Sequence, residues 1–350
     1  MRSTAISSRT YRSSFTPAGA VTGIGSLPLT SVAAAIHSIA ELSPEIPFWP
    51  QLPQISRREG AIGQGLGILG DLIEARSEGY GYQVRAGRID SVLEILYRST
   101  GELTPANAAG FGAFEEALSS GLFSSAMAGK GQIEGPITLS AYLFHQGRPF
   151  LSDPALFAAI AFHVSQIICW QIDRLKSAGL PVLLFVDEPA LCLEAPANAV
   201  SEEQRLNALT VTLNDARVRG AFAGLHCCAA RPFKRMCRAQ PDILSFDAEE
   251  GLELFFADPD ARTFVHRGGI VAYGMVPTLS RLTTLDATSI FVRWLKAATS
   301  AGDPQKLARS AMVTATCGLG LLDPSSVAES FRVARGISKL IGTLARGDDI

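Results

Sequence analysis

Eight short apolar stretches, each of a length suited to a buried β-strand, alternate along this chain with stretches of helical spacing. The eight are residues 21–27, 47–52, 131–139, 182–189, 221–228, 242–247, 269–276 and 311–317. Between them, apolar residues recur at helical spacing, as in 154–176 and 325–345. Near-continuous apolar strands alternating with helices are typical of a parallel sheet covered on both faces. Eight such units predict an α/β fold, a TIM (β/α)8 barrel. A doubly wound open sheet is the alternative.

The domain organisation predicted is a single catalytic barrel over residues 19–350. Residues 57–129 separate the second and third strands and form an insertion, with a hairpin strand near 80–84 and a short helix near 90–99. Residues 1–18 read as a disordered leader, because they are rich in Ser and Thr and contain Arg2, Arg9 and Arg12 without an acidic residue. A transit peptide is the alternative for this segment.

Composition excludes several classes of partner. The formal net charge is −2, so the chain has no general attraction for nucleic acid or a membrane surface. No continuous apolar run reaches the roughly 18 residues expected of a membrane span. Six cysteines in 350 residues, without a secretory signal, do not resemble a disulfide framework. We therefore expect a cytoplasmic protein that binds neither nucleic acid nor membrane.

Unusual polar residues follow the predicted strands. Active sites of TIM barrels lie at the carboxyl ends of the strands, so polar side chains gathered there indicate a site. In strand order they are Ser26, Gln51, Glu134 with Thr138, Asp187 with Glu188, His226 with Cys228, Asp247, and Cys317. Their convergence on one rim predicts that the active site lies there.

His226, Cys228 and Cys317 have the donor atoms of a zinc site. His226 and Cys228 are two residues apart on a strand, so their side chains share a face, whereas Cys227 points the other way. Zinc takes thiolate sulfur, imidazole nitrogen and carboxylate oxygen in a tetrahedral shell. The alternative is that these cysteines are small buried hydrophobic residues.

Five segments together resemble the catalytic barrel of cobalamin-independent methionine synthase, whose superfamily includes uroporphyrinogen decarboxylase and corrinoid-dependent methyltransferases. The resemblance covers about residues 20–345. Residues 47–53 also resemble a single-barrel subgroup labelled methionine synthase II. The five segments are Gly23-Ile24-Gly25-Ser26-Leu27-Pro28, Gly135-Pro136-Ile137-Thr138-Leu139, Val186-Asp187-Glu188-Pro189-Ala190, His226-Cys227-Cys228 and Cys317-Gly318-Leu319-Gly320.

The resemblance implies a zinc ion bound by His226, Cys228, Cys317 and a carboxylate. Asp247 is the preferred carboxylate because it ends the sixth strand, and Glu250 is the alternative. Zinc deprotonates a coordinated thiol, and the resulting thiolate attacks a methyl group. On this interpretation His226, Cys228, Cys317 and Asp187 are the catalytic residues.

The same resemblance implies a binding site for an amino-acid substrate. Asp187, with a lesser role for Glu188, would pair with the ammonium group of homocysteine. Ser26 and the backbone of Ile24 and Gly25 would hold its carboxylate, and Gln51 or Glu59 would assist at the amine. The alternative for an acidic pair at the end of a strand is that it caps a following helix.

Two departures from the family bear on the methyl donor. The folate-dependent synthases carry a second barrel, and they place a histidine after the seventh strand, where this chain has none in residues 272–278. A folate nitrogen needs a general acid to leave, and a cobalt(I) corrinoid does not. The sequence therefore favours methylcobalamin, or a separate corrinoid protein as partner, over methyltetrahydrofolate.

The function predicted from sequence is thus a zinc-dependent methyltransferase that methylates a small-molecule thiol, homocysteine, to give methionine. Three alternatives stay open at this point. They are methyl transfer to another thiol acceptor, decarboxylation of a porphyrinogen, and a zinc-binding barrel without catalysis.

Overall fold

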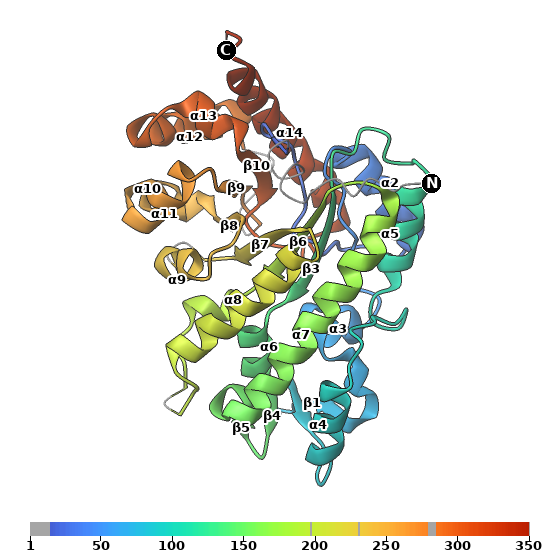
Figure 1. The fold of residues 1–350 in the computed structure, drawn as a ribbon. Helices are drawn as coiled ribbons and strands as arrows, with labels where there is room; N and C mark the ends of the chain where they lie inside the picture. The colour runs from blue at the N-terminus through green and yellow to red at the C-terminus, as the bar shows by residue number, and fades with distance from the viewer. Residues whose placement is uncertain (1–14, 197, 230–231, 279–284, 350) are drawn as a thin grey trace, which may run out of the picture.

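The computed structural model describes residues 15–196, 198–229, 232–278 and 285–349, and shows parallel strands surrounded by helices (Figure 1). Six strands form one parallel sheet in the order β10-β9-β8-β7-β6-β3. They are β3 (Gly129–Glu134), β6 (Val182–Asp187), β7 (Phe222–Cys227), β8 (Ile243–Asp247), β9 (Ile270–Val276) and β10 (Ala311–Ala315). Each falls within or overlaps one of the strands predicted from the sequence.

Two further extended segments close this sheet into a barrel. They contribute single parallel bridges, namely Val21–Val313, Ser26–Gln51 and Phe48–Lys130. The first joins β10, the last joins β3, and the middle one joins the two segments to each other. The amide of Thr22 donates to the carbonyl of Val313 at 3.1 Å, and the amide of Lys130 donates to that of Pro47 at 2.8 Å. The fold is therefore a TIM barrel, and the predicted class is confirmed.

Helices follow the strands and cover the outside of the barrel. Residues 154–176 and 325–345, predicted as helical, form α7 and α14. The helices of the outer layer are α2 (Val32–Leu42), α6 (Pro136–Tyr142), α7 (Pro154–Leu175), α8 (Glu202–Val218), α9 (Phe233–Arg238), α10 (Ala248–Ala257), α11 (Pro259–His266), α12 (Ala287–Ala301), α13 (Pro304–Arg309) and α14 (Pro324–Arg346).

An Asp-Pro dipeptide starts several of these helices. Asp153, Asp258 and Asp303 each accept hydrogen bonds from backbone amides of the first turn, and the proline that follows occupies the first helical position. Aspartate satisfies amides that have no partner within the helix, and proline has no amide to satisfy there. Helix starts are therefore encoded locally.

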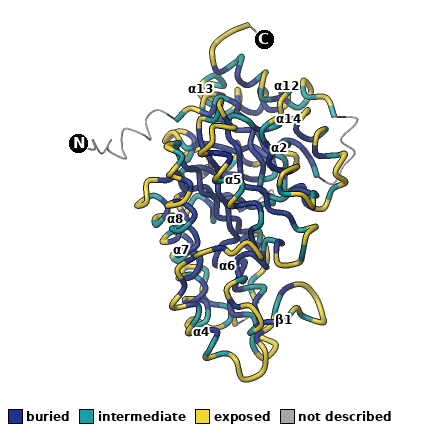
Figure 2. The backbone as a smooth tube through the Cα atoms, turned by 90° about the vertical axis from the view of Figure 1, so that its right-hand side faces the viewer, coloured by how far each residue is buried: buried dark blue, intermediate teal, exposed yellow. Residues whose placement is uncertain are grey.

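The interior of the barrel is apolar at one end and polar at the other. Inward side chains nearest the amino ends of the strands, such as Leu183, Ile243, Ile270 and Met312, form a cluster separate from the larger core between strands and helices. Figure 2 shows buried residues concentrated along the strands and the inner sides of the helices. Because side chains alternate along a strand, the inward-facing positions continue toward the carboxyl ends, where they are occupied by polar residues.

The insertion after the second strand folds as a small lobe beside the barrel. It contains α3 (Ala61–Gly65), β1 (Ile73–Ala75), β2 (Tyr82–Val84) and α4 (Ile89–Tyr97), whereas α5 (Ala109–Ser119) packs against α2 in the outer layer of the barrel. The sheet of the lobe has the order β1-β2-β4-β5 and includes β4 (Leu143–His145) and β5 (Arg148–Pro149). The predicted hairpin strand near 80–84 and helix near 90–99 correspond to β2 and α4.

The predicted third strand, 131–139, is too long. The strand ends at Glu134, and Pro136 begins α6. Proline lacks an amide hydrogen and suits the first position of a helix, which explains the early end. Thr138 consequently lies on a helix rather than at a strand end.

Residues 1–14 of the predicted leader lie outside the described residues. Phe15 packs its ring against Phe222, with centroids 5.1 Å apart. Among the described residues, one helical stretch, Pro154–Ala178, is long and apolar enough to cross a membrane, with mean hydropathy 1.6. That stretch is α7 and its extension, and 56% of its most apolar window is buried against the protein, as expected of a core helix. A single helix of this kind is weak evidence for a membrane protein.

Candidate active site

A row of polar side chains crosses four strands at the carboxyl end of the barrel. Glu134 of β3 is in register with Asp187 of β6, Asp187 with His226 of β7, and His226 with Ser245 of β8. Side chains in register on parallel strands point to the same face of the sheet. His226 Nδ1 lies 2.9 Å from Ser245 Oγ, which orients the imidazole. The structure thus brings two predicted residues, Asp187 and His226, together at the barrel mouth.

Two carboxyl oxygens in this row lack partners. Among the described residues, Glu134 Oε2 and Asp187 Oδ1 are buried with no hydrogen-bond partner. Burial raises the pKa of Glu134 well above its usual range, and the nearby negative charge of Asp187 raises it further. Burial also raises the pKa of Asp187, to about 6, against the opposing effect of His226 and Lys130. Both adjacent carboxyl groups therefore hold their protons to higher pH than exposed carboxyl groups do.

Lys130 is a buried cation of the site that the sequence analysis did not single out. Its side chain lies inside the barrel with 1% exposure. The ammonium donates to the carbonyl of Ile24 at 2.6 Å and to Gln132 Oε1 at 2.9 Å. Burial lowers the pKa of Lys130 to about 8, and Asp187 opposes that shift. The signal in the sequence was polar residues at every second position, Lys130, Gln132 and Glu134, within an otherwise buried strand.

The predicted thiol–imidazole set is assembled in part. Hydrogen bonding with Cys228 and His226 lowers the pKa of Cys317 to about 4, despite partial burial. The pKa of Cys228 is raised, chiefly because its thiol donates to Cys317. Ser26 Oγ accepts from the amide of Gly320 at 3.2 Å and so steadies the loop that carries Cys317. Cys317 therefore lies against both Cys228 and His226 at the mouth.

The two carboxylates predicted as zinc ligands, Asp247 and Glu250, lie at the start of a helix. Asp247 caps α10, where its Oδ1 accepts from the amides of Glu249 and Glu250 at 2.8 and 3.3 Å. Glu250 is exposed on the first turn of that helix. Within the part of the chain that the structure describes, no three His, Cys, Asp or Glu side chains are arranged to hold a metal ion. The four-ligand zinc site stays a prediction.

Glu188 is engaged in supporting α6. Its carboxylate accepts from the amide of Ile137 at 2.9 Å and from the amide and hydroxyl of Thr138 at 2.8 and 2.6 Å. Burial raises the pKa of Glu188 to about 7. Glu188 therefore supports a helix that precedes it in the chain, and its side chain makes no capping hydrogen bond to the turn that follows it, so it does not cap a following helix as the alternative had it.

The segment predicted to hold a substrate carboxylate, Ile24 to Ser26, lies beside Gln51. The amide of Gln51 donates to the carbonyl of Gly25 at 3.0 Å, and its side chain donates to Gln64 Oε1 at 2.6 Å. A Cβ atom on Gly25 would collide with the Gln51 side chain, so this close approach requires glycine. Glu59 is held by the amide of Ala109 at 2.7 Å.

The small lobe reaches the mouth through the loop between β1 and β2. Tyr80 of this loop packs edge-on against Tyr142, with ring centroids 5.3 Å apart. Burial raises the pKa of Tyr80, and the negative charge of Glu134 contributes to that shift. The insertion therefore supplies one wall above the carboxyl pair.

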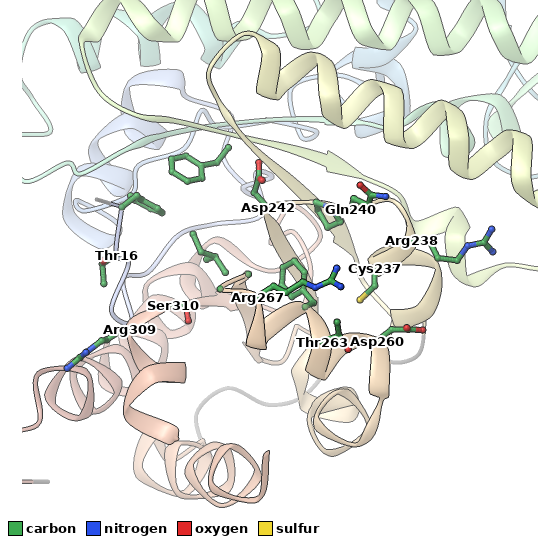
Figure 3. A pocket seen from close by; sticks show the side chains of 17 residues that line it. Thr16, Cys237, Arg238, Gln240, Asp242, Asp260, Thr263, Arg267, Arg309 and Ser310 are labelled. Atoms are coloured by element: carbon green, nitrogen blue, oxygen red, sulfur yellow. The ribbon is translucent and has the colours of Figure 1, made fainter. Parts of the chain in front are cut away.

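A cavity of about 900 Å³ lies at the opposite end of the barrel (Figure 3). Its lining includes Asp242 and Ile270 near the amino ends of β8 and β9, and Arg309 and Ser310 just before β10. In TIM barrels this end contributes to stability, whereas catalysis occurs at the carboxyl ends. We therefore place the candidate site at the mouth, where the ionisable residues converge.

Comparison with known proteins gives no family. No family model matches the chain, and no curated protein matches it. A solved L-ribulose 3-epimerase is 16% identical with a TM-score of 0.41, covering 75% of this chain and 91% of its own. A D-psicose 3-epimerase is 11% identical with a TM-score of 0.38, covering 75% and 95%. A GH5_18 protein from Bifidobacterium longum subsp. longum is 10% identical with a TM-score of 0.42, covering 89% and 72%. At such identities the likeness concerns the fold alone.

These findings correct the family assignment made from sequence. The chain matches no methionine synthase model, and solved structures of similar fold are sugar epimerases and other barrel enzymes. The predicted methyltransferase activity, with homocysteine as acceptor, is therefore wrong. The physical reason is that short motifs at strand ends recur in barrels of unrelated function, because every TIM barrel places polar residues there. The thiol substrate and the corrinoid donor or partner were inferred from that assignment and stay untested.

Proposed function

We propose that the barrel mouth is the active site of an enzyme that transfers protons to and from a small polar substrate. One observation carries the proposal. Glu134 Oε2 and Asp187 Oδ1 are buried side by side at the carboxyl ends of adjacent strands, without hydrogen-bond partners in the described structure. Buried polar atoms are normally paired, so a substrate that donates hydrogen bonds would complete this site.

The two carboxyl groups suit opposite roles. Burial and the adjacent acids raise the pKa of Glu134 well above its usual range, which suits the role of general acid. Asp187 ionises at about pH 6, so near neutral pH it is the general base. Lys130 and His226 stabilise the negative charge of Asp187. Paired groups with separated pKa values are the usual arrangement for acid–base catalysis.

The charge of the mouth favours substrates rich in hydrogen-bond donors. The ionised Asp187 carboxylate accepts hydrogen bonds at the site, and the ammonium of Lys130 already donates to Ile24 and Gln132. Hydroxyl groups and a protonated amine both meet this requirement. Asp187 would contact the substrate, as predicted from the sequence, and would do so as the negatively charged general base.

Proton transfer at carbon is tested by deuterium exchange. The protein is incubated in D2O with a defined set of aldoses, ketoses, amino sugars and amino acids, and NMR follows loss of C–H signals. The proposal predicts exchange in one chemical class, lost in Asp187→Asn and in Glu134→Gln. Asp286→Asn, which removes an exposed helix cap, is the matched control and should keep the rate. Exchange that persists in Asp187→Asn would refute the assignment of the base.

A specific contact also supports a proposed zinc ion at this mouth. The Cys317 thiol contacts both Cys228 and His226, so two sulfurs and an imidazole lie together. These are donors that zinc prefers, and Asp247 is the carboxylate we propose as the fourth. Bound zinc would supply a Lewis acid and lower the pKa of whatever occupies its open position.

Metal content of the purified protein tests the zinc proposal. About one zinc per chain is expected, lost in His226→Ala and in Cys317→Ala. Cys169→Ser, a cysteine on α7 away from the mouth, should retain it. Protein that takes up no zinc under reducing conditions would rule the metal out.

We further propose a cytoplasmic location, since all six cysteines are free in the structure.

A further inference from the structure

A second thiol pair lies on the outer side of the barrel wall, away from the carboxyl pair. Cys192 ends the 3-10 turn Pro189–Cys192 that follows β6, and Cys227 ends β7. The amide of Glu188 donates to the carbonyl of His226 at 2.8 Å, which holds the turn against β7. The Cys192 and Cys227 thiols lie against each other, and the Cys192 thiol also donates to the carbonyl of Pro189 at 2.8 Å. Because Cys227 alternates with His226 on the strand, its sulfur faces outward rather than into the mouth.

The two thiols differ in access. Cys192 is exposed, whereas Cys227 is fully buried behind it. Cys192 lines a cavity of about 580 Å³, open to solvent, whose other described lining residues include Lys234, Arg235 and Arg238. The cavity therefore gives a small oxidant access to Cys192, beside cationic side chains.

The surroundings of Cys192 also favour its thiolate. The Cys227 hydrogen bond, helped by the charge of Arg235, lowers the pKa of Cys192 to about 6. Arg235 is fixed in place, since its guanidinium donates to the carbonyl of Leu191 at 2.8 Å. In contrast, burial raises the pKa of Cys169 and raises that of Cys237 to about 12. Thiolate character and exposure govern susceptibility to oxidation, so Cys192 is the more reactive thiol.

We propose that Cys192 and Cys227 form a reversible disulfide when the protein meets a hydroperoxide. The Cys192 thiolate attacks the peroxide oxygen, the O–O bond breaks, and the released alkoxide or hydroxide takes a proton. The resulting sulfenic acid is attacked by the sulfur of Cys227, which loses its proton as water leaves. Overall the two thiols lose two electrons and two protons, and the peroxide is reduced to water and an alcohol, or to two waters. A dithiol reductant reverses the reaction.

The bond would join two segments that carry the proposed active site. Cys192 follows the segment bearing Asp187, and Cys227 lies between His226 and Cys228. Oxidation would therefore covalently tie the end of β6 to the end of β7. This inference does not depend on the acid–base proposal, because it concerns the outer face of the wall.

Peptide mapping by mass spectrometry tests the proposal. The full chain is reduced, treated with one equivalent of hydrogen peroxide, alkylated and digested. We expect a linked pair of peptides containing Cys192 and Cys227, two hydrogens lighter than the reduced pair and restored by dithiothreitol. Cys192→Ser should abolish the linkage. Cys227→Ser, which keeps a hydrogen-bond donor beside Cys192, should leave Cys192 as a sulfenic acid that dimedone traps. Cys237→Ser, the matched control, should behave as the parent protein.

Two outcomes would overturn the proposal. One is a Cys228–Cys317 linkage while Cys192 remains alkylated as a free thiol. The other is the absence of any linked pair, with no dimedone adduct on Cys192 in Cys227→Ser. Circular dichroism of each variant confirms that the substitutions leave the fold intact, so that neither outcome arises from unfolding.

Discussion

Buried titratable side chains define the chemistry of this molecule, and His163 shows how one is held neutral. Its Nε2 donates to the carbonyl of Gly65 at 2.8 Å, and its Nδ1 accepts from Ser99 Oγ at 2.6 Å. Ser99 Oγ in turn accepts from the amide of Gly101 at 3.1 Å. Both ring nitrogens are therefore satisfied in the neutral form. Burial lowers the pKa of His163 from 6.5 to about 4.

The His163 shift predicts a loss of stability in acid. The unfolded chain takes up a proton at this residue near pH 6.5 and the folded chain only near pH 4, so the unfolded state is favoured as pH falls between those values. The contribution is fully present above pH 6.5, and about 3 kcal/mol is lost by pH 4. Urea unfolding of parent and His163→Gln from pH 7 to 4 measures it. The free-energy difference between them should narrow by that amount, and a constant difference would contradict the account.

At the residue scale, the sequence located some functional groups and missed others. Asp187, His226, Cys228 and Cys317 follow apolar strands, and strand alternation is enough to place them at one rim. Lys130 was missed because a charged residue inside a strand reads as a break in the apolar pattern. Cys192 carries no signal in the sequence, since its partner Cys227 is distant along the chain and only the folded barrel brings the two together.

Among the elements, α6 depends most on a residue outside itself. Glu188 accepts three hydrogen bonds at its first turn, from Ile137 and Thr138. A Cβ atom on Gly135 would collide with the Glu188 carboxylate, so glycine is required where the strand gives way to the helix. The helix carries no capping side chain of its own.

This arrangement predicts that Glu188→Ala destabilises the protein by about 3 kcal/mol, because buried donors lose their acceptor. Glu188→Gln should cost less, since its amide oxygen still accepts. Glu203→Ala, which removes an exposed acid from the first turn of α8, serves as the control and should change stability little. Thermal and urea unfolding measure the relative stability of the parent and the three variants. Equal stability of Glu188→Ala and the parent would show that α6 has another source of support.

The ends of helices and strands could be predicted where nearby residues in the sequence signal them. Asp-Pro dipeptides mark the starts of several helices, and α7 and α14 were found within two residues of their observed ends. The third strand was overextended because Ile137 and Leu139 continue its apolar pattern, while the helix start at Pro136 depends on Glu188, a residue about fifty positions away.

For the whole molecule, closure of the barrel rests on few contacts. The first two strands each join the sheet through single bridges, with hydrogen bonds such as that from Val313 to the carbonyl of Ala20 at 3.0 Å. The apolar cluster inside the barrel includes Ala20 and Ile46 from these segments, so closure also buries apolar surface.

Closure predicts the pattern of hydrogen exchange. Peptides covering residues 19–27 and 46–51 should be protected to an extent comparable with β6, because their amides pair within a closed barrel. The loop around Gly79 supplies the unprotected reference. Exchange measured by mass spectrometry would contradict closure if those two segments exchanged as fast as that loop.

The fold class could be predicted from the sequence, but the family could not. Fold class follows from eight repeated units, so errors in single strands do not change it. Family and reaction depend on a few residues at strand ends, and barrels of many functions share such positions. That is why the TIM barrel prediction is confirmed and the methyltransferase prediction is wrong.

The most direct test of the central claim is an NMR titration of the carboxyl carbons of Glu134 and Asp187 in metal-free protein. Glu134→Gln and Asp187→Asn assign the two signals, and Lys130→Met should move the midpoint of Asp187 upward, because the ammonium lowers it. We predict that Asp187 titrates near pH 6 and that Glu134 titrates well above its ordinary value. Titration of both groups at their ordinary values, 3.8 and 4.5, would contradict an acid–base site at this mouth.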